Sequence, residues 1–120
     1  MQRDMELVRQ ILLKLEEHPH GFAPRLEVPG FTDEQIGYHA AIMGEAGLLH
    51  ARPITAHGAS SPSALPIYLT WAGYEFLASA KDESTWKKGT SLVMSKAGAI
   101  GFDILKAVLM AEIRSKVGLP

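Results

Sequence analysis

The chain has 120 residues, of which 47% are hydrophobic and 21% are charged, with 12 basic and 13 acidic side chains and no cysteine. This length and composition fit one folded domain with its own core and exclude an intrinsically disordered chain. The absence of cysteine excludes disulfides, thiol catalysis and thiolate metal sites, and a net charge of −1 argues against a protein that coats nucleic acid by bulk charge.

No stretch of the sequence has the pattern of a signal peptide or a membrane span. Apolar residues near the N-terminus are interrupted by Arg9 and Lys14, whereas a signal peptide needs about 7–15 consecutive apolar residues. The most apolar window, residues 97–111, contains Asp103 and is shorter than the roughly 20 residues that cross a bilayer. We therefore expect a cytoplasmic protein that makes no membrane contact.

Residues 4–18 are predicted to form the first helix. Its apolar side chains recur at helical spacing and build one stripe, which consists of Leu7, Val8, Ile11, Leu12 and Leu15. Asp4 suits the positive end of the helix dipole, and Pro19 ends the helix. A connection rich in Pro and Gly follows, in which residues 25–28 alternate polar and apolar as a short edge strand would.

Residues 32–46 are predicted to form the second helix. Thr32 and Gln35 have the spacing of a capping box, and Gly47 suits the left-handed position that ends a helix. The apolar row of this helix is Ile36, Ala40 and Met43, with Leu48 just beyond its end. These signals predict one buried side and one outward side.

A β-hairpin is predicted directly after this helix. Its arms are residues 49–55 and 64–70. The loop between them, residues 56–63, is small and polar, so we expect it to project into solvent as a wing.

Three more helices are expected, over residues 71–80, 82–95 and 102–117, with a break at residues 98–101. The apolar side of the first of these is predicted to contain Trp71, Tyr74, Phe76 and Leu77. The chain is therefore expected to be mainly α with a small β-hairpin, an α+β fold.

A helix followed at once by such a hairpin is the layout of a winged helix-turn-helix domain, in which the helix before the hairpin reads DNA. We assign this domain to residues 1–80 and a C-terminal helical extension to residues 81–120, the two forming one structural unit. Residues 36–49, with His39 three positions after Ile36 and an Ala-Gly-Leu turn, resemble the recognition helix of ArsR-like repressors. Residues 69–77 resemble the strand-to-helix junction that follows the wing in several winged-helix families.

Four stretches in order carry a resemblance that covers nearly the whole chain. They are Arg-Asp-Met-x-Leu-x-Arg-x-Ile-Leu at residues 3–12, Tyr38-His39, Glu45-Ala46-Gly47-Leu48, and Leu-Thr-Trp-Ala-Gly-x-Glu-Phe-Leu at residues 69–77. Together they resemble a small bacterial and prophage family numbered 2513 among the domains of unknown function, which often carries His where this chain has Tyr74. The resemblance implies the winged-helix fold and a bacterial or phage origin, and it implies no activity.

If the second helix enters the major groove of DNA, its reading residues are Gln35, Tyr38, His39 and Ile42. The wing residues that would lie along the DNA backbone are Arg52, His57, Ser60 and Ser61. Most DNA affinity comes from phosphates neutralised by Lys and Arg, yet residues 32–46 contain three acidic residues and no basic one. Residues 1–80 hold five basic and nine acidic side chains, and residues 81–120 hold seven basic and four acidic.

The sequence therefore leaves two hypotheses for the partner. One is a DNA-binding transcription regulator, in which dimerisation brings basic residues of the C-terminal extension to the backbone. The other is a phage-type module that binds and modulates a host or defence protein without touching DNA, because a fold does not fix a function.

No arrangement of residues supports catalysis, a metal or another cofactor, so we expect a protein that is not an enzyme and holds no cofactor. His18 and His20 flank a proline at a helix end, where their rings are not expected to converge on a metal. His39 lies beside the apolar row and fits a buried, hydrogen-bonded histidine better than a general base. The wing serines lack the sharp turn of a hydrolase nucleophile.

The last helix carries a wide apolar stripe, formed by Phe102, Leu105, Leu109 and Ile113. This stripe either packs within the chain, on the first helix, or forms the interface of a two-fold homodimer. Trp71 and Trp86 are expected in the core or in an interface.

Overall fold

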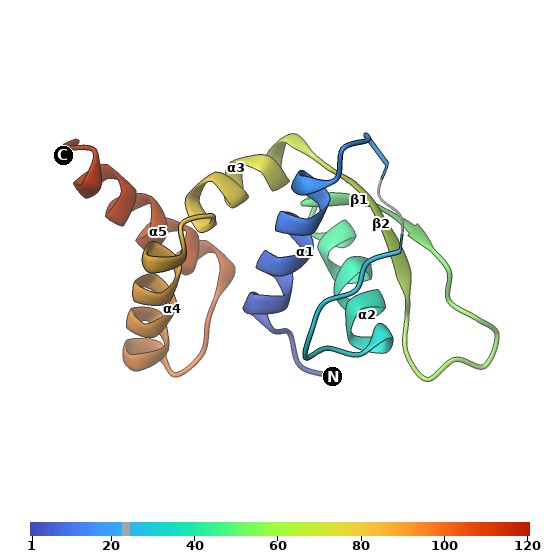
Figure 1. Ribbon diagram of the computed structural model, residues 1–120. Coiled ribbons are helices and arrows are strands. Elements are labelled where there is room, and N and C mark those ends of the chain that lie inside the picture. The colour runs from blue at the N-terminus through green and yellow to red at the C-terminus, as the bar shows by residue number, and fades with distance from the viewer. Residues whose placement is uncertain (23–24) are drawn as a thin grey trace. The chain divides into compact units, whose positions relative to one another are not determined.

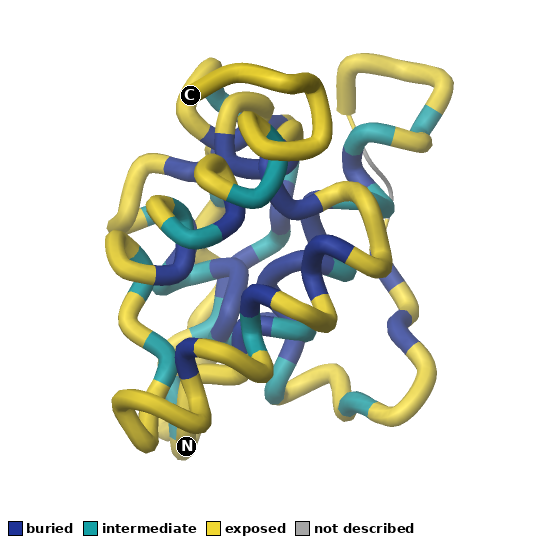
Figure 2. The backbone as a smooth tube through the Cα atoms, turned by 90° about the vertical axis from the view of Figure 1, so that its left-hand side faces the viewer, coloured by how far each residue is buried: buried dark blue, intermediate teal, exposed yellow. Residues whose placement is uncertain are grey.

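The computed structural model describes residues 1–22 and 25–120, and in this part of the chain it contains five helices and one two-stranded sheet (Figure 1). The mainly helical α+β architecture expected from the sequence is confirmed. The chain forms two compact units, Met1–Glu75 and Phe76–Pro120, with the boundary inside helix α3 (Trp71–Ala80). Along the helices, buried residues alternate with exposed ones, so each helix has a buried side and an exposed side (Figure 2).

Helix α1 (Met5–Glu17) begins the first unit. The Asp4 carboxylate accepts hydrogen bonds from the backbone N–H groups of Glu6 and Leu7, at 2.9 and 3.3 Å, and so caps the helix. The predicted apolar stripe is confirmed, because all five of its side chains are buried. Within this unit α1 packs against α2 and β2.

Helix α2 (Asp33–Glu45) begins with the predicted capping box. Thr32 Oγ1 accepts from the Gln35 N–H at 3.1 Å, and Gln35 Oε1 accepts from the Thr32 N–H at 2.8 Å. Gly47 has φ +78°, which confirms the expected left-handed end of the helix. The predicted apolar row is buried and places α2 on the hairpin.

The short strand predicted for residues 25–28 is wrong. Leu26 and Val28 are buried, as the alternation predicted, but no strand forms there. The Phe31 N–H donates to the Val28 carbonyl at 3.2 Å, so the backbone turns at once. Pro29, which has no N–H to offer a neighbouring strand, stands inside that turn.

The hairpin consists of β1 (Leu49–Pro53) and β2 (Ala64–Leu69), paired antiparallel. Its register is irregular between His50 and Ala51, where the partner on β2 changes from Tyr68 to Pro66. Because a proline cannot donate a ladder hydrogen bond, Pro66 accounts for the interruption at this point. The arms end earlier than predicted, since the ladder stops at Pro53.

Helix α3 begins in close contact with the turn that precedes the hairpin. The Gly73 N–H donates to Thr70 Oγ1 at 3.0 Å, so Thr70 caps the first turn of the helix. A Cβ at Gly73 would overlap the Leu48 carbonyl oxygen, so only glycine fits here.

In the second unit, α4 (Glu83–Ala97) and α5 (Phe102–Lys116) form a packed helical pair. Gly98, at φ +71°, ends α4 and confirms the predicted break. A Cβ at Gly89 would lie 2.7 Å from Cδ2 of Leu109, so this glycine lets the two helices approach closely. Asp82 caps α4 by accepting from the Thr85 N–H at 2.9 Å.

Candidate functional site

The outward face of α2 carries carboxylates at both ends. Ala41 follows Glu34 by seven positions and Glu45 follows it by eleven, which places all three on one side of the helix. Glu34 and Glu45 are exposed, whereas Tyr38 and Ile42, two of the predicted reading residues, are half-buried. Among the described residues, the outward face of α2 therefore carries no Lys or Arg that could pair with a phosphate.

The wing loop does not simply project into solvent. Ser60 Oγ and Ser61 Oγ both donate to Glu34 Oε1, at 3.4 and 3.1 Å. The loop is exposed along most of its length, as expected, but these two bonds hold it beside the first turn of α2. Ser60 and Ser61 were predicted to lie along the DNA backbone beside the reading helix. They instead bond to a carboxylate in the first turn of that helix.

His39 does not lie on the outer face of α2, which corrects its predicted place among the reading residues. Its side chain is 1% exposed. Nδ1 bonds to the Gln35 carbonyl at 2.8 Å, and Nε2 accepts from the backbone N–H of Asp4 at 2.8 Å. This network assigns the proton to Nδ1 and occupies both ring nitrogens, so His39 connects α2 to the start of α1 and contacts no external ligand.

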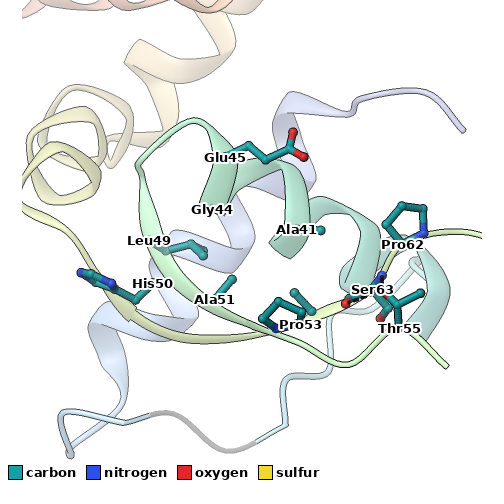
Figure 3. A pocket seen from close by; sticks show the side chains of 11 residues that line it. Ala41, Gly44, Glu45, Leu49, His50, Ala51, Pro53, Thr55, Pro62 and Ser63 are labelled. Atoms are coloured by element: carbon teal, nitrogen blue, oxygen red, sulfur yellow. Dashed lines mark hydrogen bonds between the residues drawn. The ribbon is translucent and has the colours of Figure 1, made fainter.

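A groove of about 510 Å³ runs between the C-terminal half of α2 and the hairpin (Figure 3). Its lining is mostly small or apolar: Ala41, Gly44, Glu45, Leu49, His50, Ala51, Pro53, Thr55, Pro62, Ser63 and Ala64. Glu45 is the carboxylate of this lining, at the end of the groove nearest the C-terminus of α2 (Figure 3). Such a lining can receive an extended polypeptide backbone, because small side chains let it approach closely.

Exposed aromatic side chains lie on the hairpin, against it, and in the first turn of α3. The His50 and Tyr68 rings stack with centroids 4.3 Å apart, and Phe22 meets Tyr68 edge-on at 5.8 Å. Trp71 is 81% exposed and follows Tyr68 by three residues, so their Cα atoms lie within about 11 Å. We call these residues, together with exposed Tyr74, the aromatic surface: Phe22, His50, Tyr68, Trp71 and Tyr74.

The sequence did not identify this surface. Trp71 and Tyr74 were expected on the apolar side of α3, but both are exposed, and only Phe76 and Leu77 of that predicted set are buried. His50 and Tyr68 occupy facing positions of the two arms, which would have indicated a cross-strand pair once the register was known. Phe22 lies in an irregular connection, where no periodicity gives its orientation.

The charge of the first unit is strongly acidic, with five basic and nine acidic residues in residues 1–75. Arg25 forms an ion pair with Asp33, so one of the few cations near α2 is already matched. Arg52 and His57 are exposed on the hairpin and its loop. Two isolated groups, one of them a histidine, give little of the phosphate neutralisation that DNA affinity requires.

The apolar stripe of α5, predicted either to pack within the chain or to form a dimer interface, is largely covered within the single chain. Leu105 and Leu109 are fully buried, and the Phe102 ring contacts the Phe76 ring in a tilted arrangement with centroids 4.7 Å apart. Ile113 is half-buried. Leu105 and Leu109 therefore offer no surface to a second copy, and Leu109 packs against α4 at Gly89.

Basic residues of the second unit are engaged by acidic neighbours. Lys87 pairs with Glu83 at 3.3 Å, and Lys88 pairs with Glu112 at 3.0 Å. The Lys87 pair is exposed and contributes little stability, whereas the Glu112 side chain is half-buried. Both pairs reduce the cation density available for phosphates.

The histidines and carboxylates in the described part of the chain do not gather into a metal centre. In residues 1–22 and 25–120, no cluster of three or more His, Asp or Glu side chains could hold a metal ion. The His18 and His20 ring centroids lie 5.7 Å apart, and the His20 N–H donates to His18 Nδ1 at 3.2 Å.

No helix in the described part of the chain is both long enough and apolar enough to cross a membrane.

Comparisons with known proteins place the chain among uncharacterized relatives. Residues 2–99 match the family described as hypothetical protein DUF2513. An uncharacterized protein of Haemophilus influenzae is 31% identical over 121 residues, covering 94% of this chain and 96% of that protein. No solved structure matches the chain significantly. The profile match and the full-length relative show that the chain belongs to the DUF2513 family.

Proposed function

We propose that the first unit is a winged-helix-like module that binds another protein through the aromatic surface, without enzymatic activity. One observation carries this proposal. Four of the nine Phe, Trp and Tyr side chains are exposed, and all four belong to Met1–Glu75: Phe22, Tyr68, Trp71 and Tyr74.

Exposed aromatic side chains of this kind favour protein contacts. Burying a large apolar side chain is favourable by roughly 1.5–3 kcal/mol relative to leaving it in water. A group of exposed rings therefore marks a surface that a partner covers. Trp and Tyr are also the residues that most often dominate interface energetics. Trp71 and Tyr68 are the anchors that we expect to contribute most.

Electrostatics favour a protein over DNA for the same unit. The outward face of α2 ends in Glu34 and Glu45, and Asp33 is matched by Arg25. A helix that enters a groove with this face would place carboxylates beside phosphates.

The connection between the first two helices is also long for a helix-turn-helix. Residues 18–32 connect α1 to α2, whereas the two helices of a helix-turn-helix are joined by a turn of about three to four residues.

DNA binding is the second candidate, supported by the order of α2 and hairpin and by half-exposed Tyr38 and Ile42. A mixture of random-sequence DNA duplexes at about 50 mM salt, where phosphate contacts are least screened, tests it. Fluorescence anisotropy is expected to show no binding up to high micromolar protein. Saturable binding whose affinity falls steeply with added salt would favour the DNA regulator.

Affinity purification of the full chain from its native host, after nuclease treatment of the lysate, tests the protein-binding proposal. The bait is compared with Phe22→Ala/Trp71→Ala and with Met94→Ala/Ile104→Ala, whose substituted side chains are also exposed but lie in the second unit. We expect one protein to be retained by the unsubstituted chain and the control and lost from the aromatic variant. Equal recovery by all three baits would contradict the proposal.

A further inference from the structure

The groove between α2 and the hairpin is lined mostly by small side chains and extends beyond the aromatic surface. Ala41 and Gly44 form its α2 side, and Ala51, Thr55 and Ser63 lie opposite them (Figure 3). A Cβ at Gly44 would stand 3.1 Å from the Ala51 Cβ, so the floor has no room for larger side chains. Only His50 belongs both to this lining and to the aromatic surface.

A carboxylate lies near each end of this groove. Glu45 belongs to its lining. Glu34 lies three helical turns earlier on the same side of α2, and the serines that bond to it directly precede Pro62 and Ser63 of the lining. Eleven residues of α-helix separate the two Cα atoms by about 16 Å, given a rise of 1.5 Å per residue.

We propose that the groove binds an extended segment of a protein partner that carries two basic side chains about five residues apart. Five residues of extended chain span about 16 Å, which matches the separation of Glu34 and Glu45. A Lys or Arg at each end would pair with one carboxylate, and the residues between would lie on the small-residue floor. This inference rests on the proposed function insofar as both require a protein partner, but it uses a different surface.

Charge favours a basic protein segment in this groove over nucleic acid or a second copy of this chain. The carboxylates repel phosphates, and the surplus of acidic residues in the first unit attracts a basic segment. A second copy of this chain does not supply the ligand, because its one pair of basic residues separated by four others is Arg9 and Lys14. Both belong to helix α1, where Arg9 is buried, so they cannot present an extended segment.

Selection from a library of random peptides displayed on phage, with the full chain as bait at low salt, tests this inference. We expect enriched sequences to share two Lys or Arg residues separated by four others. For a peptide so enriched, Glu34→Gln/Glu45→Gln should weaken binding about three- to tenfold, since two exposed ion pairs are lost. The control Glu17→Gln/Glu27→Gln removes the same charge from exposed positions outside the groove and should leave binding unchanged.

Other outcomes overturn the groove as the site. They are enrichment without paired basic residues, absence of enrichment, or equal weakening by the two double variants. If Tyr68→Ala abolishes peptide binding while the Glu34→Gln/Glu45→Gln variant does not, the aromatic surface takes the peptide. In that case this inference fails and the proposed protein-binding function stands.

Discussion

The backbone N–H of Asp4 donates a 2.8 Å hydrogen bond to Nε2 of His39, thirty-five residues further along the chain. The cap of α1 is thereby joined to the middle of α2 through a buried imidazole. In the ArsR-like resemblance the same histidine stands in a recognition helix. Here its two nitrogens are used inside the protein, so its role is structural.

Replacing His39 with Ala should destabilise the first unit. The change leaves a cavity and removes the partner of a buried backbone N–H, which together cost about 2–4 kcal/mol. Urea denaturation followed by circular dichroism would measure the difference. His57→Ala, which alters an exposed histidine of the wing loop, should stay within about 0.5 kcal/mol, and a comparable loss in this control would contradict the assigned role.

Gly73→Ala should also be strongly destabilising. The added methyl group would overlap the Leu48 carbonyl, and backbone atoms cannot move aside as a flexible side chain can. We expect a loss of about 1–3 kcal/mol or more in the free energy of unfolding. Gly21→Ala is the matched control, because nothing lies within 4 Å of the place that its new methyl group would occupy. Equal stability of the two variants would show that the turn at Leu48 adjusts freely.

Leu109→Ala tests the packing of α5 on α4. Leu109 is fully buried and reaches Gly89, so its truncation should cost about 2–5 kcal/mol. Ile104→Ala on the same helix removes an exposed side chain and should change the stability of the monomer little. Sedimentation of both variants completes the test, since a concentration-dependent dimer that only Leu109→Ala dissociates would favour the dimer interface as the role of this stripe.

The Asp82 cap makes the second unit sensitive to acid. A hydrogen bond from the Thr85 backbone N–H, followed by those from Ser84 and Lys116, holds the pKa of Asp82 well below its ordinary value of 3.8. Because the folded-state pKa is depressed, this contribution to stability is complete above about pH 4 and is lost as the pH falls through the folded-state value.

The comparison of the parent chain with Asp82→Asn measures this effect. A Trp71→Phe background leaves buried Trp86 as the sole tryptophan reporter of unfolding in the second unit. The stability difference between the two proteins should be largest near neutral pH and shrink in strong acid. A difference that does not depend on pH would show that the charge of Asp82 contributes nothing.

Local signals in the sequence were enough to predict most of the fold. The Thr32–Gln35 capping box, the left-handed glycines at positions 47 and 98 and the apolar stripe of α1 each depend on neighbouring residues, and the structure confirms them. The strand predicted at residues 25–28 fails because alternation reports burial of Leu26 and Val28 but does not report a pairing partner.

Much less of the candidate site could be predicted. Periodicity gives the side of a helix, but the exposure of Trp71 depends on what the rest of the chain covers. The bonds from Ser60 and Ser61 to Glu34 join residues 26 and 27 positions apart, and no local pattern encodes them. The stacking of His50 on Tyr68 depends on a register that shifts at Pro66.

The most direct measurement of the central claim is photo-cross-linking in the native host from a benzoylphenylalanine placed at position 68. The same group at position 104, an exposed site of the second unit, is the matched control. The account predicts one protein adduct of defined mass from position 68, absent from position 104 and reduced at least about fivefold by Trp71→Ala, a loss of roughly 1 kcal/mol in binding. Adducts to DNA alone, or the same protein adducts from both positions, would contradict it.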